Sequence, residues 1–262
     1  MKKNPFEKKF IFITGTPRSG SSMLTKVIDA HPDIAMLMEN NFGNRRRHWE
    51  KNEAWNSPEN LIKEVEILYS RLKEPIIGNK VCTPDVWCAD DINMFCRLFK
   101  NFKILFIVRD PGAVALSRQT REVGKQDYSL VYNEKAKENI LLNFKSQFHT
   151  YISSWRQSIE TYWKLTDVFG DKVKIVYYED FCDRFEEQAK KIFNFLDIKF
   201  SGRVLNWYKY PHYDGGGNMV RDLKYKDAPV FARSKYENHP KDLSEVLKTV
   251  EWQFHLWENR KL

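Results

Sequence analysis

The sequence predicts an α/β fold, a single domain in which helices flank a central, mainly parallel sheet. Two observations predict it. Short apolar runs alternate with stretches of helical periodicity, the pattern of strands joined by crossover helices. The first apolar run enters a glycine-containing turn followed by a helical stretch, the strand, loop and helix order of phosphate-loop folds. With 262 residues and 42% apolar content, the chain can bury one large core, so we expect one domain over residues 1–262.

Five apolar runs predict the buried strands of this sheet. The run over residues 76–77 is so short that only its position between two helical stretches favours a strand. The others are long enough to be buried strands in their own right. The predicted strands cover residues 10–13, 34–37, 76–77, 104–108 and 173–177.

The helices are predicted from apolar spacing and from their end signals. A helix should begin at Met23, and Thr83, Pro84 and Asp85 supply an N-cap, a first-turn proline and a first-turn acid for another. Aromatic residues at intervals of three or four over residues 141–165 predict one long amphipathic helix whose aromatics belong to the core.

Two further helices are expected near the C-terminus. Asp180 is a natural N-cap for the first, and apolar positions over residues 243–257 predict the second. The segment between them, residues 201–239, contains the glycines Gly215 to Gly217 and many basic residues. We expect it to be either a mobile linker or a loop that closes over a ligand.

The turn after the first strand carries the clearest chemical signal. Its spacing matches the phosphate-loop pattern at both glycines and at the last serine, but Ser21 stands where a nucleotide triphosphatase has its lysine. A glycine turn before a helix directs backbone N–H groups at an oxyanion, and Arg18 can supply the missing charge. The loop consists of Gly15, Thr16, Pro17, Arg18, Ser19, Gly20, Ser21 and Ser22.

A second anion site is predicted at the end of the 104–108 strand. Arg109 follows this strand directly, and Ser117 and Arg121 lie on the next predicted helix. Ligands of open α/β sheets bind at the carboxyl ends of the strands, so Arg109 should face the same region as the glycine loop. A guanidinium group and a hydroxyl suit a phosphate monoester.

The two motifs together closely resemble those of sulfotransferases that use 3′-phosphoadenosine 5′-phosphosulfate, abbreviated PAPS. The resemblance implies that the glycine loop holds the 5′-phosphosulfate and that Arg109 and Ser117 hold the 3′-phosphate. It extends over most of the chain, through four further segments in the family's order. These segments are residues 29–32, Asp-Ala-His-Pro; 78–80, Gly-Asn-Lys; 177–181, Tyr-Tyr-Glu-Asp-Phe; and 234–235, Ser-Lys.

Within that family the chain is most similar to the tyrosylprotein and Golgi-type carbohydrate branch, because its loop has Pro17 and Arg18 where small-molecule enzymes usually carry lysine. The resemblance implies a P-loop-like sulfotransferase fold and in-line sulfuryl transfer to a hydroxyl of a glycan, a tyrosyl peptide or another small, phenolic acceptor. It assigns Glu39 as the catalytic base and Lys80 to a place near the transferring sulfuryl group. The charges of Arg18 and Lys80 suit stabilisation of the leaving oxygen without a metal. The resemblance also implies PAPS contacts from Arg121, Tyr178 and Lys235.

Two other functions stay open from the residues alone. A phosphate-loop kinase or nucleotide triphosphatase would use the 104–108 strand for a magnesium aspartate, although Ser21 and Arg109 disfavour it. A nucleic-acid-binding protein would use the net charge of +8, but the aromatics follow helical stripes and do not alternate with basic residues. We therefore expect no nucleic-acid partner.

The remaining signals concern compartment and surface. The four cysteines lack metal-site or disulfide spacing, so reduced thiols are expected. The apolar run after the basic N-terminus is too short for a signal or membrane helix, so we expect no membrane span and a cytoplasmic protein.

Two further segments have expected roles outside the donor site. His31 should fix the turn after the first helix. The basic run over residues 45–48 is expected to be either a solvated face or a contact to the acceptor.

Overall fold

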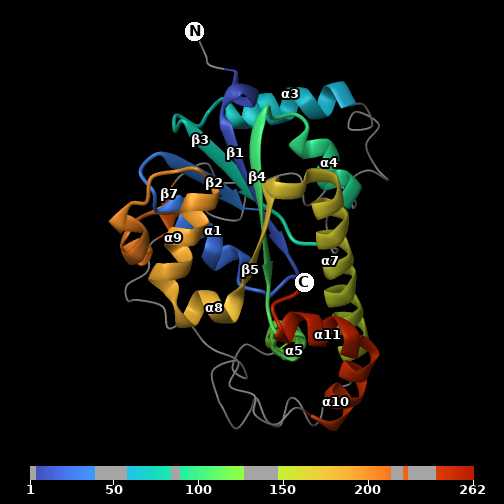
Figure 1. Cartoon of the computed structure of the whole chain (residues 1–262). Helices are drawn as coiled ribbons and strands as arrows, with labels where there is room; N and C mark the ends of the chain where they lie inside the picture. Colours follow the sequence, from blue (N-terminus) through green and yellow to red (C-terminus); the bar gives the residue numbers. More distant parts are fainter. Residues whose placement is uncertain (1–3, 39–57, 84–88, 127–146, 214–220, 224–239) are drawn as a thin grey trace.

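A computed structural model describes residues 4–38, 58–83, 89–126, 147–213, 221–223 and 240–262 of the chain (Figure 1). Its centre is a five-stranded sheet in the order β2-β3-β1-β4-β5, in which every neighbouring pair is parallel. The α/β prediction and all five predicted strands are confirmed. The strands are β1 (Lys9–Gly15), β2 (Ile34–Met38), β3 (Ile76–Lys80), β4 (Asn101–Val108) and β5 (Val173–Tyr177).

Helices cover both faces of the sheet, because alternate residues of each buried strand point to opposite sides. Phe10 and Phe12 of β1 pack on the face covered by α3 (Pro58–Tyr69), α4 (Ala89–Cys96) and α7 (Phe148–Phe169). Ile11 and Ile13 pack on the other face. That face is covered by α1 (Ser21–Asp29), α8 (Tyr178–Asp183) and α9 (Phe185–Phe195).

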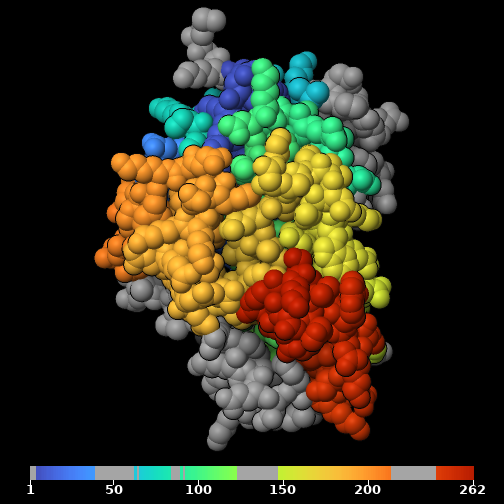
Figure 2. Space-filling view, viewed as in Figure 1, coloured from blue at the N-terminus to red at the C-terminus, as the bar shows by residue number. Residues whose placement is uncertain are grey.

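A third apolar cluster lies beyond the carboxyl end of β4, where α5 (Pro111–Gln126) packs on α7. Trp155 of α7 is fully buried there. The C-terminal helices α10 (Lys241–Leu247) and α11 (Glu251–Glu258) complete this cluster, and Figure 2 shows them in red against the yellow α7. A short 3-10 turn, η6 (Lys248–Val250), separates these two helices, so the single C-terminal helix expected from the sequence is interrupted.

The helix ends differ from several sequence predictions. The first helix begins at Ser21 instead of Met23. The prediction of Asp180 as an N-cap is wrong: Tyr177 holds that position, and α8 and α9 are separated at Arg184. The carboxylate of Asp180 instead binds the guanidinium group of Arg260, with N···O distances of 3.1 and 3.2 Å.

Two other predicted helices are only partly described. The long aromatic helix runs from Phe148 to Phe169, and residues 141–146 lie outside the described chain. Pro84 and Asp85 also lie outside it, so the predicted cap at Thr83 stays a prediction. Two 3-10 turns, η1 (Pro5–Glu7) and η4 (Gly170–Lys172), lead into β1 and β5.

The segment after α9 is better packed than a linker. It forms the 3-10 element η5 (Gly202–Lys209) and the strands β6 (His212–Tyr213) and β7 (Arg221–Leu223). The His212 ring is buried, with Nδ1 3.1 Å from Asp29 Oδ2 and Nε2 2.8 Å from the Trp207 carbonyl. The other Asp29 oxygen accepts the Met36 N–H. Residues 201–213 are therefore anchored to α1 and β2, whereas Gly215 to Gly217 lie outside the described residues.

His31 has the structural role expected for it. Its Nε2 lies 3.0 Å from the Lys199 carbonyl, and its Nδ1 accepts the N–H of Asp33. The ring therefore holds the turn between α1 and β2. The basic run over residues 45–48 lies outside the described part.

Candidate active site

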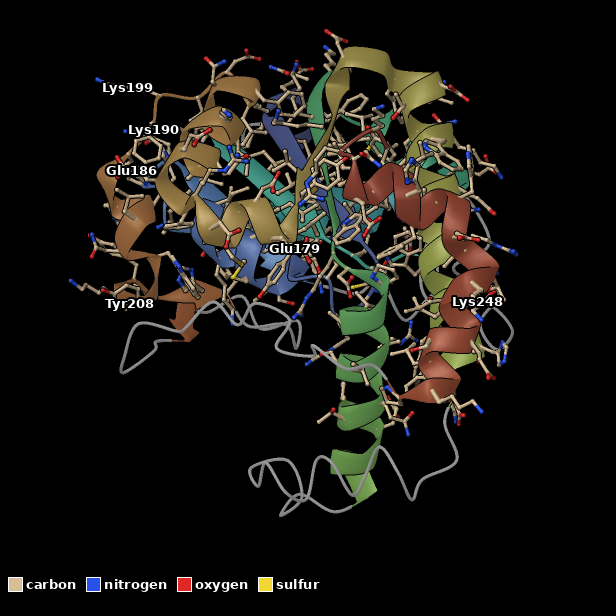
Figure 3. The ribbon with its side chains drawn as sticks, turned by 60° about the horizontal axis from the view of Figure 1, so that its bottom comes forward. Glu179, Glu186, Lys190, Lys199, Tyr208 and Lys248 are labelled. Carbon is tan, nitrogen blue, oxygen red and sulfur yellow. The ribbon has the colours of Figure 1, made fainter. Side chains whose placement is uncertain are left out.

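Those predicted site residues that the structure describes lie at or just beyond the carboxyl ends of four parallel strands. The pairing sets Ile13 of β1 opposite Lys80 of β3, and Gly15 opposite Ile107 of β4. Val108, which precedes Arg109, is paired with Tyr177 of β5. Figure 3 is turned so that this end of the molecule comes forward. The glycine loop, Lys80, Arg109 and Tyr178 therefore share one edge of the sheet, as the sequence predicts.

The backbone of the glycine loop requires glycine at two positions. Gly15 has φ +150°, and a Cβ added there would lie 2.1 Å from the Ile107 carbonyl oxygen. Gly20 has φ +95°, and its Cβ would lie 2.5 Å from the Tyr178 ring. Arg18 also adopts a left-handed conformation, with φ +75°. The loop is thus closely fitted against β4 and Tyr178, and its curvature is fixed by the fold.

Two hydroxyl groups of the loop fit an oxyanion ligand. Thr16 Oγ1 and Ser19 Oγ are buried and have no hydrogen-bond partner among the residues that the structure describes. Buried hydroxyls normally have partners, so unpaired ones beside a glycine turn favour an acceptor supplied by a ligand. Ser21, in the position of the missing lysine, opens α1, and its Oγ lies 3.8 Å from Cys82 Sγ.

Side chains connect the glycine loop to the second motif. Arg18 Nε donates a hydrogen bond to Ser117 Oγ at 3.1 Å, and Arg109 Nη1 donates to the Arg18 carbonyl at 3.3 Å. The two predicted anion sites therefore form one continuous polar surface. Arg121 lies one helical turn beyond Ser117 on α5.

The electrostatics of this surface favour an anion. Burial lowers the pKa of Arg18 below its usual value, and the nearby positive charges of Arg121 and Arg109 lower it further. The two neighbouring guanidinium groups thus destabilise the charged form of Arg18. A polyanionic ligand would relieve this repulsion and gain charge-assisted hydrogen bonds.

Tyr178 lies beneath Arg109 at the start of α8. The Arg109 guanidinium carbon is 4.4 Å from the centroid of the Tyr178 ring, which also contacts the loop at Gly20. Burial raises the pKa of Tyr178 to about 12, so its hydroxyl is protonated near neutral pH. The ring thus packs against both anion-binding motifs, at Gly20 and at Arg109. The PAPS contact expected for Tyr178 stays a prediction.

Lys80 ends β3 beside the glycine loop and is 3% exposed. The chain stays close to the loop after it, since Thr83 N donates to the Gly15 carbonyl at 3.0 Å. Lys80 is thus at the expected edge of the sheet. Glu39 directly follows β2, which ends at Met38, and both Glu39 and Lys235 lie outside the described residues. Their predicted roles are untested.

Two supporting residues were not singled out from the sequence. The indole Nε1 of Trp155 donates to the Arg109 carbonyl at 3.0 Å, and Glu179 Oε1 accepts the Asp110 N–H at 3.0 Å. The sequence assigned Trp155 to the aromatic core stripe, and Glu179 was noted only as part of the 177–181 motif. A carboxylate two residues after a strand at the ligand edge was the available signal for Glu179.

Three of the four cysteines are described, and Cys82, Cys96 and Cys182 are all free thiols. In the described segments, no group of three or more His, Cys, Asp and Glu side chains is placed to hold a metal ion. None of the helices in these segments is both long and apolar enough to cross a membrane.

Comparison with known proteins decides the family. The profile of the family described as "Sulfotransferase family" matches residues 11–202. The chain belongs to the sulfotransferase family. The matched region contains the glycine loop, Lys80, the Arg109 motif and Tyr178, so the resemblance inferred from these motifs is confirmed.

Curated members of the sulfotransferase family are similar to most of the chain. The protein-tyrosine sulfotransferase of Drosophila melanogaster is 28% identical over 242 residues, which cover 86% of this chain and 45% of that protein. The protein-tyrosine sulfotransferase A of Caenorhabditis elegans is 26% identical over 212 residues, covering 75% and 52% respectively. The chain thus spans about half the length of these two relatives.

Solved structures establish the sulfotransferase fold. The sulfotransferase domain from the curacin biosynthetic pathway has a TM-score of 0.56 and 17% identity, covering 93% of this chain and 98% of that one. The sulfotransferase domain from the Synechococcus PCC 7002 olefin synthase has a TM-score of 0.53 and 18% identity, covering 94% and 95%. The whole described arrangement of sheet and helices therefore belongs to this fold.

Proposed function

We propose that the protein transfers a sulfuryl group from PAPS to a hydroxyl group, and that the hydroxyl belongs to a tyrosine side chain of a protein. The observation that carries the proposal is the hydrogen bond from Arg18 to Ser117, which joins two anion-binding motifs into one surface. A donor with a 5′-phosphosulfate and a 3′-phosphate presents anionic groups at two ends of one nucleoside. Membership of the sulfotransferase family supports the same chemistry.

The roles of the residues follow from their positions. The hydroxyls of Thr16 and Ser19 and the N-terminus of α1 would bind the 5′-phosphosulfate. Arg109 and Ser117 would bind the 3′-phosphate, with Arg121 adding charge from the same helix. When bound, PAPS supplies an activated sulfuryl group and a phosphate leaving group. Arg18 and Lys80 would stabilise the negative charge that develops on the leaving oxygen.

The acceptor must lose its hydroxyl proton as its oxygen bonds to sulfur. Glu39 is proposed as the base that receives this proton, because it follows β2 at the ligand edge of the sheet. The tyrosyl acceptor is supported by the relatives that are named protein-tyrosine sulfotransferases, whose matches cover most of this chain. A glycan hydroxyl is the alternative acceptor.

Ligand-dependent stability tests the donor. Adenosine 3′,5′-bisphosphate, the expected product, should raise the melting temperature by mass action, and ATP with magnesium should raise it much less. Arg109→Ala should abolish most of the shift. No shift at saturating bisphosphate would refute the donor assignment, and magnesium-dependent ATP turnover would favour a phosphate-loop kinase or nucleotide triphosphatase.

Transfer of radiolabelled sulfate from PAPS tests the acceptor and the base. Tyrosyl peptides should be labelled in preference to glycans and simple phenols. Glu39→Gln should keep bisphosphate binding and lose turnover by about a hundredfold or more. Labelling of glycans alone would overturn the tyrosyl acceptor, and full activity of Glu39→Gln would assign the base elsewhere.

A further inference from the structure

We propose that Trp155 and Glu179 are positioning residues that clamp the peptide group between Arg109 and Asp110 and thereby aim the Arg109 side chain at the 3′-phosphate. The inference rests on the proposed function, since it concerns the selectivity of the same donor site. We call these two residues the peptide clamp. Neither needs to touch the donor itself.

The clamp acts on both polar ends of one peptide group. Trp155 Nε1 donates to the carbonyl oxygen of Arg109 at 3.0 Å, and Glu179 Oε1 accepts from the N–H of Asp110 at 3.0 Å. A peptide group is planar, so hydrogen bonds at its oxygen and at its N–H together restrict rotation of the whole group. The Cα of Arg109, which lies in this plane on the side of β4, is therefore held in position as well.

The two residues reach the peptide from different helices. Trp155 lies on α7 and is fully buried, whereas Glu179 lies in the first turn of α8. Figure 3 shows Glu179 where the gold α8 approaches the top of the green α5. The peptide is consequently tied to two elements on opposite faces of the sheet, and it cannot rotate without breaking one bond.

The clamped peptide also begins the helix that carries the rest of the second motif. The Asp110 carboxylate accepts the N–H of Ala113 at 2.6 Å, and the Asp110 carbonyl accepts the N–H of Val114 at 3.0 Å. Asp110 therefore caps α5, which bears Ser117 and Arg121. Holding this peptide sets the direction of both Arg109 and the helix behind it.

Glu179 holds the peptide group through one carboxylate oxygen that accepts a hydrogen bond. Its Oε1 receives the Asp110 N–H, whereas its buried Oε2 has no hydrogen-bond partner among the described residues. Glutamine retains an acceptor oxygen at nearly the same place, and methionine has a similar length without it. Glu179→Gln and Glu179→Met thus form a matched pair that separates the clamp from side-chain volume.

The test compares two ligands that differ only in the 3′-phosphate. Isothermal titration should give dissociation constants for adenosine 3′,5′-bisphosphate and adenosine 5′-phosphate with the full chain and each variant. Trp155→Phe and Glu179→Met should each reduce the preference for the bisphosphate roughly fivefold, the effect of about one hydrogen bond. Glu179→Gln should keep it within about twofold, as should Trp163→Phe, a control elsewhere on α7.

The outcomes separate the clamp from the proposed function. If the wild-type protein does not bind the bisphosphate, the proposed function fails. If it binds the bisphosphate selectively and Trp155→Phe and Glu179→Met keep the wild-type ratio, the clamp is overturned. An equal loss for both ligands would also overturn it, since that indicates a general structural defect. Should Trp155→Phe fail to fold, the Glu179 pair decides by itself.

Discussion

Ser117 Oγ accepts a hydrogen bond from Arg18 Nε at 3.1 Å, although the two residues are 99 positions apart in the sequence. Arg18 belongs to the turn after β1, and Ser117 belongs to the helix after β4. Because β1 and β4 are neighbouring parallel strands, their carboxyl ends and the segments that follow them meet at one edge. The pair therefore links the two halves of the proposed donor site.

Ser117→Ala should weaken adenosine 3′,5′-bisphosphate binding about tenfold, because it removes a hydroxyl that partners a charged group and faces the proposed 3′-phosphate site. Isothermal titration measures the effect. Thr120→Ala is the matched control, since within the described segments the Thr120 hydroxyl donates to the Leu116 carbonyl of its own helix. Equal affinities for wild type and Ser117→Ala would contradict the assignment.

Gly20→Ala should destabilise the fold by about 2 kcal/mol or more, because the new Cβ would meet the Tyr178 ring at 2.5 Å and the residue has φ +95°. Denaturant unfolding measures the change. Gly202→Ala provides a control, as no described residue beyond its neighbours in the chain and its own helical turn lies within 4 Å of its Cβ position. It should alter the free energy of unfolding by less than about 0.5 kcal/mol. Similar losses in both variants would refute the close contact.

The pH dependence of stability should differ between wild type and Glu179→Gln. Burial raises the pKa of Glu179 above its usual value of 4.5, although the hydrogen bond from Asp110 N opposes the shift. A raised folded-state pKa means that the contribution of this carboxyl to stability is complete below pH 4.5 and is lost as pH rises through the folded-state pKa.

Glu179→Gln should therefore gain stability relative to wild type as the pH rises from about 4 to 8. Melting temperatures of the two proteins across this range give the measurement. If instead the wild-type protein gained melting temperature relative to Glu179→Gln as the pH rose, the ionised carboxylate would be favoured in the folded protein. That result would reverse the sign assigned to burial.

Asp29→Asn should destabilise the protein by about 2 to 3 kcal/mol, because Asp29 is buried and its two oxygens bond His212 and the Met36 N–H. Thermal and denaturant unfolding test this. The nearby Asp33 is exposed, and Asp33→Asn should change stability by less than about 0.5 kcal/mol. Matching values for the two variants would exclude a structural role for the Asp29 and His212 pair.

Much of the site follows from local sequence patterns. Their places after two predicted strands singled out Arg18, Arg109 and Ser117, the family resemblance supported them, and the parallel sheet brings them together as expected. The extent of β3 could not be predicted, because its last three residues, Gly78, Asn79 and Lys80, have low strand propensity. They extend the strand because β1 and β2 lie on both sides and pair with them.

Non-local contacts account for what the sequence did not show. Asp180 carries the signal of a helix cap, but its carboxylate binds Arg260 near the other end of the chain. Trp155 matches the apolar stripe of α7, and nothing in that stripe indicates that its indole N–H supports Arg109. Such roles depend on which distant segments the topology brings together.

The position of β2 at the edge of the sheet affects how the protein behaves when it loosens. All five residues of β2 are buried, and an uncovered apolar edge strand is a template for pairing between molecules. Strand β6 packs beside β2, and its His212 is bonded to Asp29 of α1. We therefore expect loss of this buried pair to loosen β6 and to make the apolar edge of β2 more accessible for pairing between molecules.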